Sequence, residues 1–205
     1  MIDKINFRDQ VRKYLLSKMR DGTLKVGDSV SLAQLARDLD VSITPIREAL
    51  SQLQHSKIIE AIPNRGFIIP QLNKQEAENI YALVAEIESL AILNSKFTDS
   101  IIKVLKKKQI YFENRQNALD RVNADIDFHE VLTSTYNNAV ATSILTDLKA
   151  RIFFYELGFM NFSNLHESSE SMHNEIIEAI ENNDLSKASA ITKQNWLQIL
   201  NFMNL

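Results

Sequence analysis

Cysteine is absent from this 205-residue chain, and glycine and proline are scarce, with four and three copies. Without cysteine the chain forms no disulfide and no zinc ribbon, which fits a reducing compartment such as the cytoplasm. Few glycines and prolines, with 45% hydrophobic and 24% charged residues, are typical of a folded and mainly helical protein. The sequence shows no signal-peptide core, and no apolar run approaches the roughly 20 residues that span a bilayer. We therefore expect a cytoplasmic protein with no membrane partner.

Positive charge is concentrated in the first third of the chain. Residues 1–70 carry 11 Lys and Arg against 8 Asp and Glu, whereas residues 71–205 carry 12 against 18. A basic head on an acidic body fits a protein whose N-terminal part contacts DNA. The asymmetry is modest, so the identity of the partner depends on motifs rather than on charge.

Two apolar stripes at helical spacing lie between residues 32 and 53. They consist of Leu32, Leu35, Ala36 and Leu39, and of Ile46, Ala49, Leu50 and Leu53. Between them, residues 41–44 form a short turn, Ser42 and Thr44 can each cap a following helix, and Pro45 fits only in its first turn. This pattern predicts a helix-turn-helix, whose second helix can enter the major groove of DNA.

The segments that flank the helix-turn-helix complete a small domain. Residues 7–19 are expected to form a first helix that packs behind it. Residues 58–62 and 67–69 are expected to form two short strands joined by a turn at residues 63–66, which is a wing. The alternative is a small helical subdomain that binds nothing.

The segment Val41-Ser42-x-Thr44-Pro45-x-Arg47-Glu48-Ala49-Leu50, with Arg65-Gly66 in the wing, resembles the DNA-binding domain of GntR-family transcription regulators. The resemblance implies a dimer that binds a palindromic operator. It implies that Arg47 contacts a base, and that Ser42 and Thr44 contact phosphates or base edges. Arg65 and Gly66 would approach the minor groove. At Ile43 the family usually has an arginine that contacts guanine, whereas isoleucine can only touch a thymine methyl group.

No strand pattern follows residue 70. The expected boundary lies at residues 70–73, which gives a DNA-binding domain at residues 1–70 and a second domain at residues 73–205. Six helices are expected at about 73–96, 100–118, 122–136, 139–157, 167–182 and 185–202, with an irregular segment at 158–165. The fold class is therefore mainly α, with a winged helix-turn-helix and a β-hairpin wing followed by an all-α six-helix bundle.

Polar residues interrupt the apolar stripes of three helices in the second domain. Asp125 and His129 are spaced i,i+4 and share a face, while His173 and Asn195 lie on the inward stripes of the last two helices. We expect all four to point toward the bundle centre, where burial is costly unless they pair or bind a metal. A hydrogen-bond network, for example with Asp125 accepting from His129, is the alternative. No additional acid or base is evident in the stripe beside them.

A second resemblance concerns these residues. The patterns are Asp125-x-x-Phe128-His129, Asn138, and His173-x-x-Ile176-x-x-Ala179-Ile180. They resemble the FCD ligand-binding domain of the FadR subfamily of GntR regulators, in its six-helix, VanR-like branch, over about residues 73–205.

The FCD resemblance implies a metal site below an effector pocket. In many such domains one Asp and three His bind a divalent metal, for which zinc, nickel and manganese are the candidates here. Asp125, His129 and His173 match three of these ligands, and Asn195 occupies the position of the fourth. An amide oxygen is a weaker ligand for zinc or nickel than an imidazole. Val84 replaces an arginine that in the family can meet a carboxylate effector, which weakens the expectation of an organic acid.

Together these features predict a DNA-binding transcription regulator and not an enzyme. The protein is expected to be a homodimer whose affinity for operator DNA changes when a small-molecule effector binds the helical domain. One alternative is a regulator that senses the metal ion itself, which titration of metal alone against operator binding would detect. The other is a metal-dependent hydrolase with an open coordination position, which would leave the N-terminal domain without a role.

Overall fold

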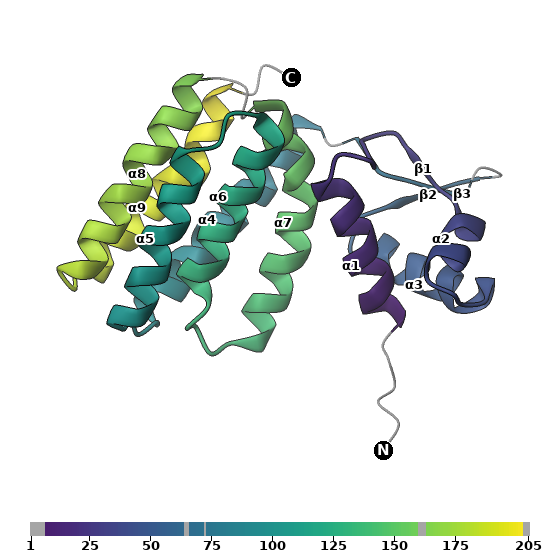
Figure 1. The fold of residues 1–205 in the computed structure, drawn as a ribbon, viewed down its shortest axis with the longest axis horizontal. Helices are drawn as coiled ribbons and strands as arrows, with labels where there is room; N and C mark the ends of the chain where they lie inside the picture. The colour runs from purple at the N-terminus through teal and green to yellow at the C-terminus, as the bar shows by residue number, and fades with distance from the viewer. Residues whose placement is uncertain (1–6, 64–65, 72, 160–162, 203–205) are drawn as a thin grey trace. The chain divides into compact units, whose positions relative to one another are not determined.

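The computed structural model describes residues 7–63, 66–71, 73–159 and 163–202 (Figure 1). The chain divides into two compact units, Met1–Gln71 and Leu72–Leu205. In the described residues, the first unit combines three helices with a small sheet, and the second unit is helical. None of the helices in the described residues has the length and apolar character needed to cross a membrane.

Helices α1 (Phe7–Arg20), α2 (Leu32–Asp38) and α3 (Ile43–His55) form the core of the first unit. Both α1 and α2 pack against α3, as the sequence predicts for a helix behind a helix-turn-helix. The buried side chains that join them are apolar and come at helical spacing, namely Val11, Leu15 and Met19, Leu35, and Ile46, Ala49, Leu50 and Leu53. The burial of these stripes is what orients α3.

The connection between α2 and α3 is tight. Ser31 caps α2, because its side chain accepts a hydrogen bond from the backbone N–H of Gln34. Asp40 adopts the left-handed conformation with φ of 52°, which aspartate tolerates better than most residues and which turns the chain. Pro45 is the third residue of α3, within the first turn, where its missing N–H costs no helical hydrogen bond.

A three-stranded antiparallel sheet completes the described part of the first unit. One of its strands precedes α2 in the chain, and the other two follow α3. The strands are β1 (Ser29–Val30), β2 (Glu60–Ile62) and β3 (Gly66–Ile68), in the order β1-β3-β2. Phe67 pairs with Ala61 on one side and with Val30 on the other. The predicted hairpin is therefore confirmed, and β1 is an addition to it that a two-residue pattern did not reveal.

In the described residues of the second unit, six helices make up a bundle (Figure 1). They are α4 (Lys74–Leu93), α5 (Asp99–Glu113), α6 (Ala118–Thr133), α7 (Ala139–Phe159), α8 (Ser163–Glu181) and α9 (Leu185–Gln198), and a 3₁₀ turn, η1 (Ile199–Phe202), follows α9. Side chains of Asn73, Thr98, Asn117 and Asp184 accept a backbone N–H at the start of α4, α5, α6 and α9. These caps explain why the helices begin where they do.

Two apolar clusters hold the bundle together. One joins α4, α7 and α9 through residues that include Tyr81, Ile152 and Trp196. The other joins α5, α6 and α8 through residues that include Phe128 and Ile176. The polar residues described below lie on the same helices, among these two clusters.

The prediction of an irregular segment at residues 158–165 was wrong at both ends. Helix α7 continues to Phe159, and α8 begins at Ser163. The early start of α8 places Leu165 and His166 on its buried side, so packing extends the helix beyond what the sequence pattern indicates.

Candidate functional site

The first candidate site is the exposed side of α3. Ser42, Thr44 and Arg47 are all exposed there, while the opposite side of the same helix is buried in the core. Ser42 occupies the N-cap position, but its hydroxyl makes no capping hydrogen bond. That hydroxyl is therefore available to an external partner, as are the donors of Arg47. Ile43 is 47% exposed beside them, so this surface also offers an apolar contact.

The wing contributes a second part of this surface. Gly66 is exposed, begins β3 and has φ of 84°, a conformation that glycine adopts without strain. It pairs with Ile62 of β2. Arg65, the other residue expected at the wing tip, lies outside the described residues.

The second candidate site is a buried polar cluster in the bundle. Asp125 and His129 come from α6, His173 from α8 and Asn195 from α9, and all four are at least 94% buried. The ligand atoms of Asp125, His129 and His173 lie within 4.8 Å of one another. Folding thus brings together the polar residues that the sequence predicts at the bundle centre.

Glu88 of α4 holds one ring nitrogen of His129. The distance from His129 Nδ1 to Glu88 Oε2 is 2.6 Å, and Trp196 Nε1 donates to the same oxygen at 2.6 Å. Lys149 Nζ lies 2.5 Å from Glu88 Oε1. Burial alone would raise the pKa of Glu88, but Lys149 and His129 outweigh burial and lower the pKa to about 2. Glu88 is therefore an ionised acceptor, and His129 donates to it from Nδ1.

Gln109 of α5 holds His173 in the same manner. Gln109 Nε2 donates to Glu113 Oε1 at 3.0 Å and to the backbone carbonyl of Glu170 at 3.1 Å, which fixes the orientation of the amide. Its Oε1 then accepts from His173 Nδ1 at 2.9 Å. Burial, with His129 and His166 nearby, lowers the pKa of His173 well below its usual value, so the ring is neutral.

The remaining polar atoms of the cluster lie close together. His129 Nε2 is hydrogen-bonded to Asn195 Oδ1 at 3.1 Å. The neutral ring of His173 donates from Nδ1, so its lone pair is on Nε2, which is 3.4 Å from Asp125 Oδ1 and lacks a hydrogen-bond partner. Two imidazole nitrogens, a carboxylate and an amide oxygen therefore converge. This donor set fits a divalent cation, and the outer bonds to Glu88 and Gln109 are of the kind that orient metal-bound histidines.

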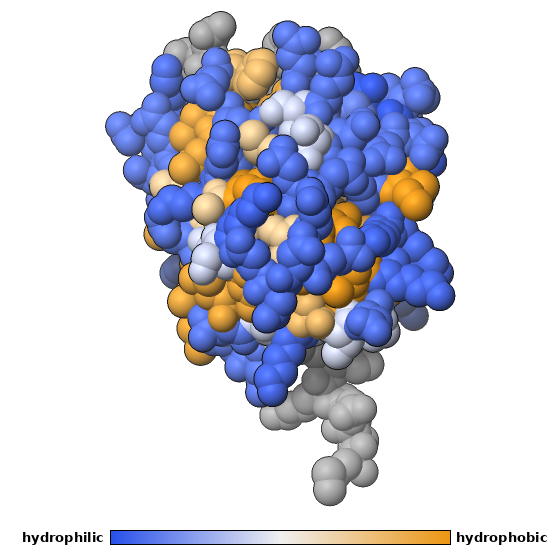
Figure 2. Space-filling model, turned by 90° about the vertical axis from the view of Figure 1, so that its left-hand side faces the viewer, coloured by the Kyte–Doolittle hydropathy of each residue, from blue (hydrophilic) through white to orange (hydrophobic). Residues whose placement is uncertain are grey.

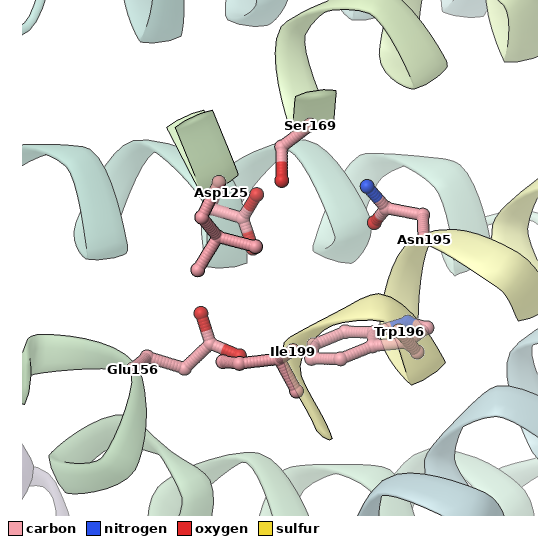
Figure 3. Close-up of a pocket in the computed structure, with 7 residues that line it drawn as sticks. Asp125, Glu156, Ser169, Asn195, Trp196 and Ile199 are labelled. Atoms are coloured by element: carbon pink, nitrogen blue, oxygen red, sulfur yellow. The ribbon is translucent and has the colours of Figure 1, made fainter. Parts of the chain in front are cut away.

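A small cavity lies next to this cluster (Figure 3). Its volume is about 10 Å³, measured as the space open to the centre of a water-sized sphere, which is room for about one water molecule. The lining residues are Asp125, Glu156, Leu165, Ser169, Asn195, Trp196 and Ile199. Figure 3 shows the carboxyl group of Glu156 on α7 and that of Asp125 on α6 turned toward the same space.

The two carboxyl groups in the cavity have raised pKa values. Burial raises the pKa of Asp125 to about 6, with Glu88 adding to the effect and His129 and Lys149 opposing it. Burial, with Asp125 nearby, raises the pKa of Glu156 well above its usual value, although Tyr81 opposes this by donating a hydrogen bond to Oε1 at 3.0 Å. Burial therefore favours the neutral form of both carboxyl groups, and the described lining residues include no Lys, Arg or His.

The sequence interpretation missed part of the site. We expected no additional acid or base beside the predicted ligands, and this was wrong, because Glu88, Lys149 and Glu156 are all buried close by. A signal existed, since Glu88 follows Ile80 and Val84 at i+8 and i+4, and Glu156 follows Ile152 at i+4.

Two family models match this chain. Residues 7–69 match the family described as bacterial regulatory proteins of the gntR family. Residues 79–196 match the FCD domain. The two matches fall on the two compact units, so the exposed face of α3 lies in the gntR match and the buried cluster lies in the FCD match.

Individual relatives are transcription regulators. The chain is 25% identical over 186 residues to the HTH-type transcriptional regulator YdhC of Bacillus subtilis, covering 86% of this chain and 80% of that protein. It is 32% identical over 83 residues to McbR of Escherichia coli, covering 40% and 38% of the two chains. The solved structure of McbR superposes with a TM-score of 0.79 at 21% identity over 98% of this chain and 100% of that one. A GntR structure from Rhodococcus gives 0.80 at 18% identity over 95% and 96%.

Proposed function

Because this chain belongs to the GntR family of bacterial regulatory proteins and carries an FCD domain, we propose that residues 1–70 bind operator DNA and that residues 73–205 bind the effector and form a homodimer. The protein is a transcription regulator and not an enzyme, since its matched domains and relatives are those of regulators. A regulator acts on the chromosome, so the proposed location is the cytoplasm.

The observation that carries the DNA-binding proposal is the division of α3 into two sides. One side supplies four buried apolar residues to the core, and the other leaves Ser42, Thr44 and Arg47 exposed together. A helix anchored in this way can lie in the major groove with its N-terminal residues at the base edges. We assign Arg47 to a base, Ser42 and Thr44 to phosphates or base edges, and Arg65 and Gly66 to the minor groove.

The test is selection of a binding site from random duplex DNA with the full-length protein, followed by affinity measurements on the selected site and on a scrambled one. Arg47→Ala should weaken binding to the selected site by roughly 1 to 3 kcal/mol and relax preference at one base pair. Arg115→Ala, which removes an arginine from the helical unit, is the matched control and should bind normally. Equal losses on both DNAs would show that Arg47 contacts only phosphate.

In the effector domain, we propose that Asp125, His129, His173 and Asn195 hold a divalent metal. The support is the convergence of their acceptor atoms and the unpartnered Nε2 of His173. A bound ion would supply a fixed positive charge to which an effector can bind. If the ion is itself the signal, zinc, nickel or manganese alone will change operator affinity. If it only assists, metal alone will leave operator affinity unchanged.

The homodimer proposal is supported by exposed apolar side chains on two helices that pack together. Leu83 and Leu90 of α4 are 53% and 49% exposed, and Val140 and Ile144 of α7 are 70% and 44% exposed. Figure 2 looks onto the side where α8 lies, and there hydrophilic side chains predominate and hydrophobic ones form separate small patches. We assign the dimer contact to the α4–α7 side, because an exposed apolar surface of this kind is stabilised by burial against a second copy.

A further inference from the structure

An apolar hollow lies between α2 and the first turn of α3. It is open to solvent, and its volume is about 590 Å³, measured as the space open to the centre of a water-sized sphere. The lining residues are Ala33, Ala36, Arg37, Asp40, Val41, Ser42 and Ile43. Four of these seven side chains are apolar, and the largest apolar one, Ile43, is 47% exposed. The hollow therefore offers its contacts mainly to an apolar group.

The charged residues at the hollow cancel each other. Among the described lining residues, Arg37 supplies the one positive charge and Asp40 the one negative charge. Nη2 of Arg37 donates to Gln34 Oε1 at 2.6 Å, which ties the guanidinium group to its own helix. A phosphate in the hollow would meet the carboxylate of Asp40 as well as this guanidinium, so it would gain little. An apolar group on a base edge meets no such conflict.

Ile43 shares a face of α3 with Arg47. Ile43 is the first residue of the helix and Arg47 follows it at i+4, so the two side chains are neighbours on the helix surface. Both are exposed, whereas Ile46 and Leu50 of the same helix are buried in the core. If α3 presents Arg47 to a base edge, it presents Ile43 to a nearby position in the same groove.

We propose that Ile43, with the apolar hollow beside it, recognises the C5-methyl group of a thymine in each operator half-site. The inference rests on the proposed DNA-binding function and adds a specificity-determining contact to it. In the major groove, the thymine methyl is the apolar group among base edges that otherwise present hydrogen-bond donors and acceptors. An isoleucine side chain can pack against this methyl group but has no donor or acceptor to offer the other bases.

Ile43 thereby selects against the other bases as well as for thymine. A donor or acceptor of another base that packs against isoleucine loses its hydrogen bond to water and gains none. The methyl group itself should contribute about a factor of four to affinity, because its burial removes one apolar carbon from water. Two such contacts in a palindromic site should contribute about fifteenfold, since distant contacts add in free energy.

The experiment uses the full-length protein and the duplex selected from random DNA, with each thymine replaced in turn by deoxyuridine. This replacement removes the methyl group and keeps the base pair. Fluorescence anisotropy of the labelled duplex gives the affinity. We expect one thymine in each half-site at which deoxyuridine lowers affinity by about fourfold, and about fifteenfold when both half-sites are changed.

The variant Ile43→Ala should lose most of this sensitivity, because the truncated side chain does not reach the methyl group. The fold should be retained, since Ile43 is exposed and alanine favours the helix, and a thermal melt checks this. Ile110→Ala is the matched control, because Ile110 is a 58% exposed isoleucine of the helical unit. It should keep the full sensitivity to deoxyuridine.

A second set of duplexes separates the methyl group from the rest of the base pair. At the sensitive position, a C·G pair should weaken binding by the wild type. A 5-methylcytosine in place of that cytosine returns a methyl group to the same position of the groove. It should recover about fourfold in affinity with the wild type and almost nothing with Ile43→Ala.

Two results would overturn the proposal. One is a wild-type affinity that deoxyuridine leaves unchanged at every thymine. The other is equal sensitivity in the wild type and in Ile43→Ala, which would assign the methyl contact to another residue. In either case, specific binding to the selected duplex would leave the proposed function intact. Failure to select any duplex would remove the proposed function and this inference with it.

Discussion

At the scale of single residues, the orientation of the two imidazoles in the buried cluster depends on which side chain accepts the hydrogen bond from Nδ1 of each ring. Glu88 holds His129, and Gln109 holds His173. Each acceptor is itself fixed, Glu88 by Lys149 and Trp196, and Gln109 by two acceptors for its own amide group. The orientation of both rings is therefore set by residues outside the ligand set, and Nε2 of His173 is left without a hydrogen-bond partner.

Asn195 tests the metal proposal. Asn195→His should add a third imidazole and tighten binding of zinc or nickel by at least about tenfold, because these ions prefer imidazole nitrogen to amide oxygen. A competition titration with a chromogenic chelator measures the change. Asn201→His, an exposed substitution on η1, is the control and should leave metal affinity unaltered.

His129→Ala should abolish metal binding in both the wild-type and the Asn195→His backgrounds. Elemental analysis of each purified protein gives the stoichiometry, and a thermal melt reports the stability. Wild-type protein that stays free of metal after incubation with zinc, nickel and manganese would end the metal proposal. In that case His129→Ala should still destabilise the fold, because Glu88 loses a hydrogen-bond partner.

Glu156 predicts a pH dependence of stability in metal-free protein. The pKa of Glu156 is raised in the folded state by burial and by Asp125. Its contribution to the stability of the fold is therefore fully present below about pH 4.5 and is lost as pH rises through the folded pKa. Tyr81 of α4 donates to this carboxyl and Asp125 of α6 lies beside it. At pH 7.5, Glu156→Gln should therefore melt at a higher temperature than the wild type, by about 2 to 4 °C for each kcal/mol of free energy of unfolding gained. At pH 4 the two proteins should melt at the same temperature.

The same melts on Glu178→Gln provide the control. Because Glu178 is exposed, the difference in melting temperature between this variant and the wild type should be the same at both pH values. A wild type that is as stable as Glu156→Gln at pH 7.5 would show that Glu156 is not held in its neutral form.

At the scale of elements, the wing depends on one backbone conformation. Gly66 has φ of 84°, and an added Cβ would meet nothing within 4 Å, so the cost of a side chain is backbone strain alone. Gly66→Val should destabilise the β2–β3 pairing by roughly 1 to 2 kcal/mol, whereas Gly66→Asn should cost less because asparagine tolerates this region. Hydrogen exchange of the β2 and β3 amides measures both. Equal protection in the two variants would refute the strain argument.

At the scale of the whole molecule, operator binding requires two copies of α3 at a fixed separation. Half-sites about one helical turn apart are the geometry that a dimer of such domains recognises. The double variant Leu83→Glu with Leu90→Glu should produce monomers and weaken binding to a palindromic site, because the second half-site no longer binds intramolecularly. Sedimentation velocity gives the mass, and gel shift gives the affinity.

Ile110→Glu is the matched control for the dimer contact, since Ile110 on α5 is 58% exposed but lies on another helix. It should remain dimeric. A dimeric Leu83→Glu, Leu90→Glu protein would place the contact elsewhere, and a monomer that binds a single half-site at full strength would remove the dimer from the proposal.

The sequence by itself determined the features that are local. Helical spacing predicts α1 to α3 and the bundle helices, and the motif from Val41 to Leu50 together with the pattern around Asp125 and His173 indicates the family. These are local because a helix face repeats every few residues, and because a cap or a turn depends on neighbours in the chain. The burial of Asp125, His129, His173 and Asn195 follows from the same periodicity.

Only the tertiary structure decided which partners these buried residues and Glu156 contact. Glu88 is 41 residues from His129, Gln109 is 64 from His173, and Tyr81 is 75 from Glu156. Such pairs depend on how six helices pack and on the rotation of each about its axis, which periodicity in one segment does not fix. The same holds for β1, whose two residues become a strand only because β3 lies beside them. A buried charge is stable only with a partner, and packing supplies that partner.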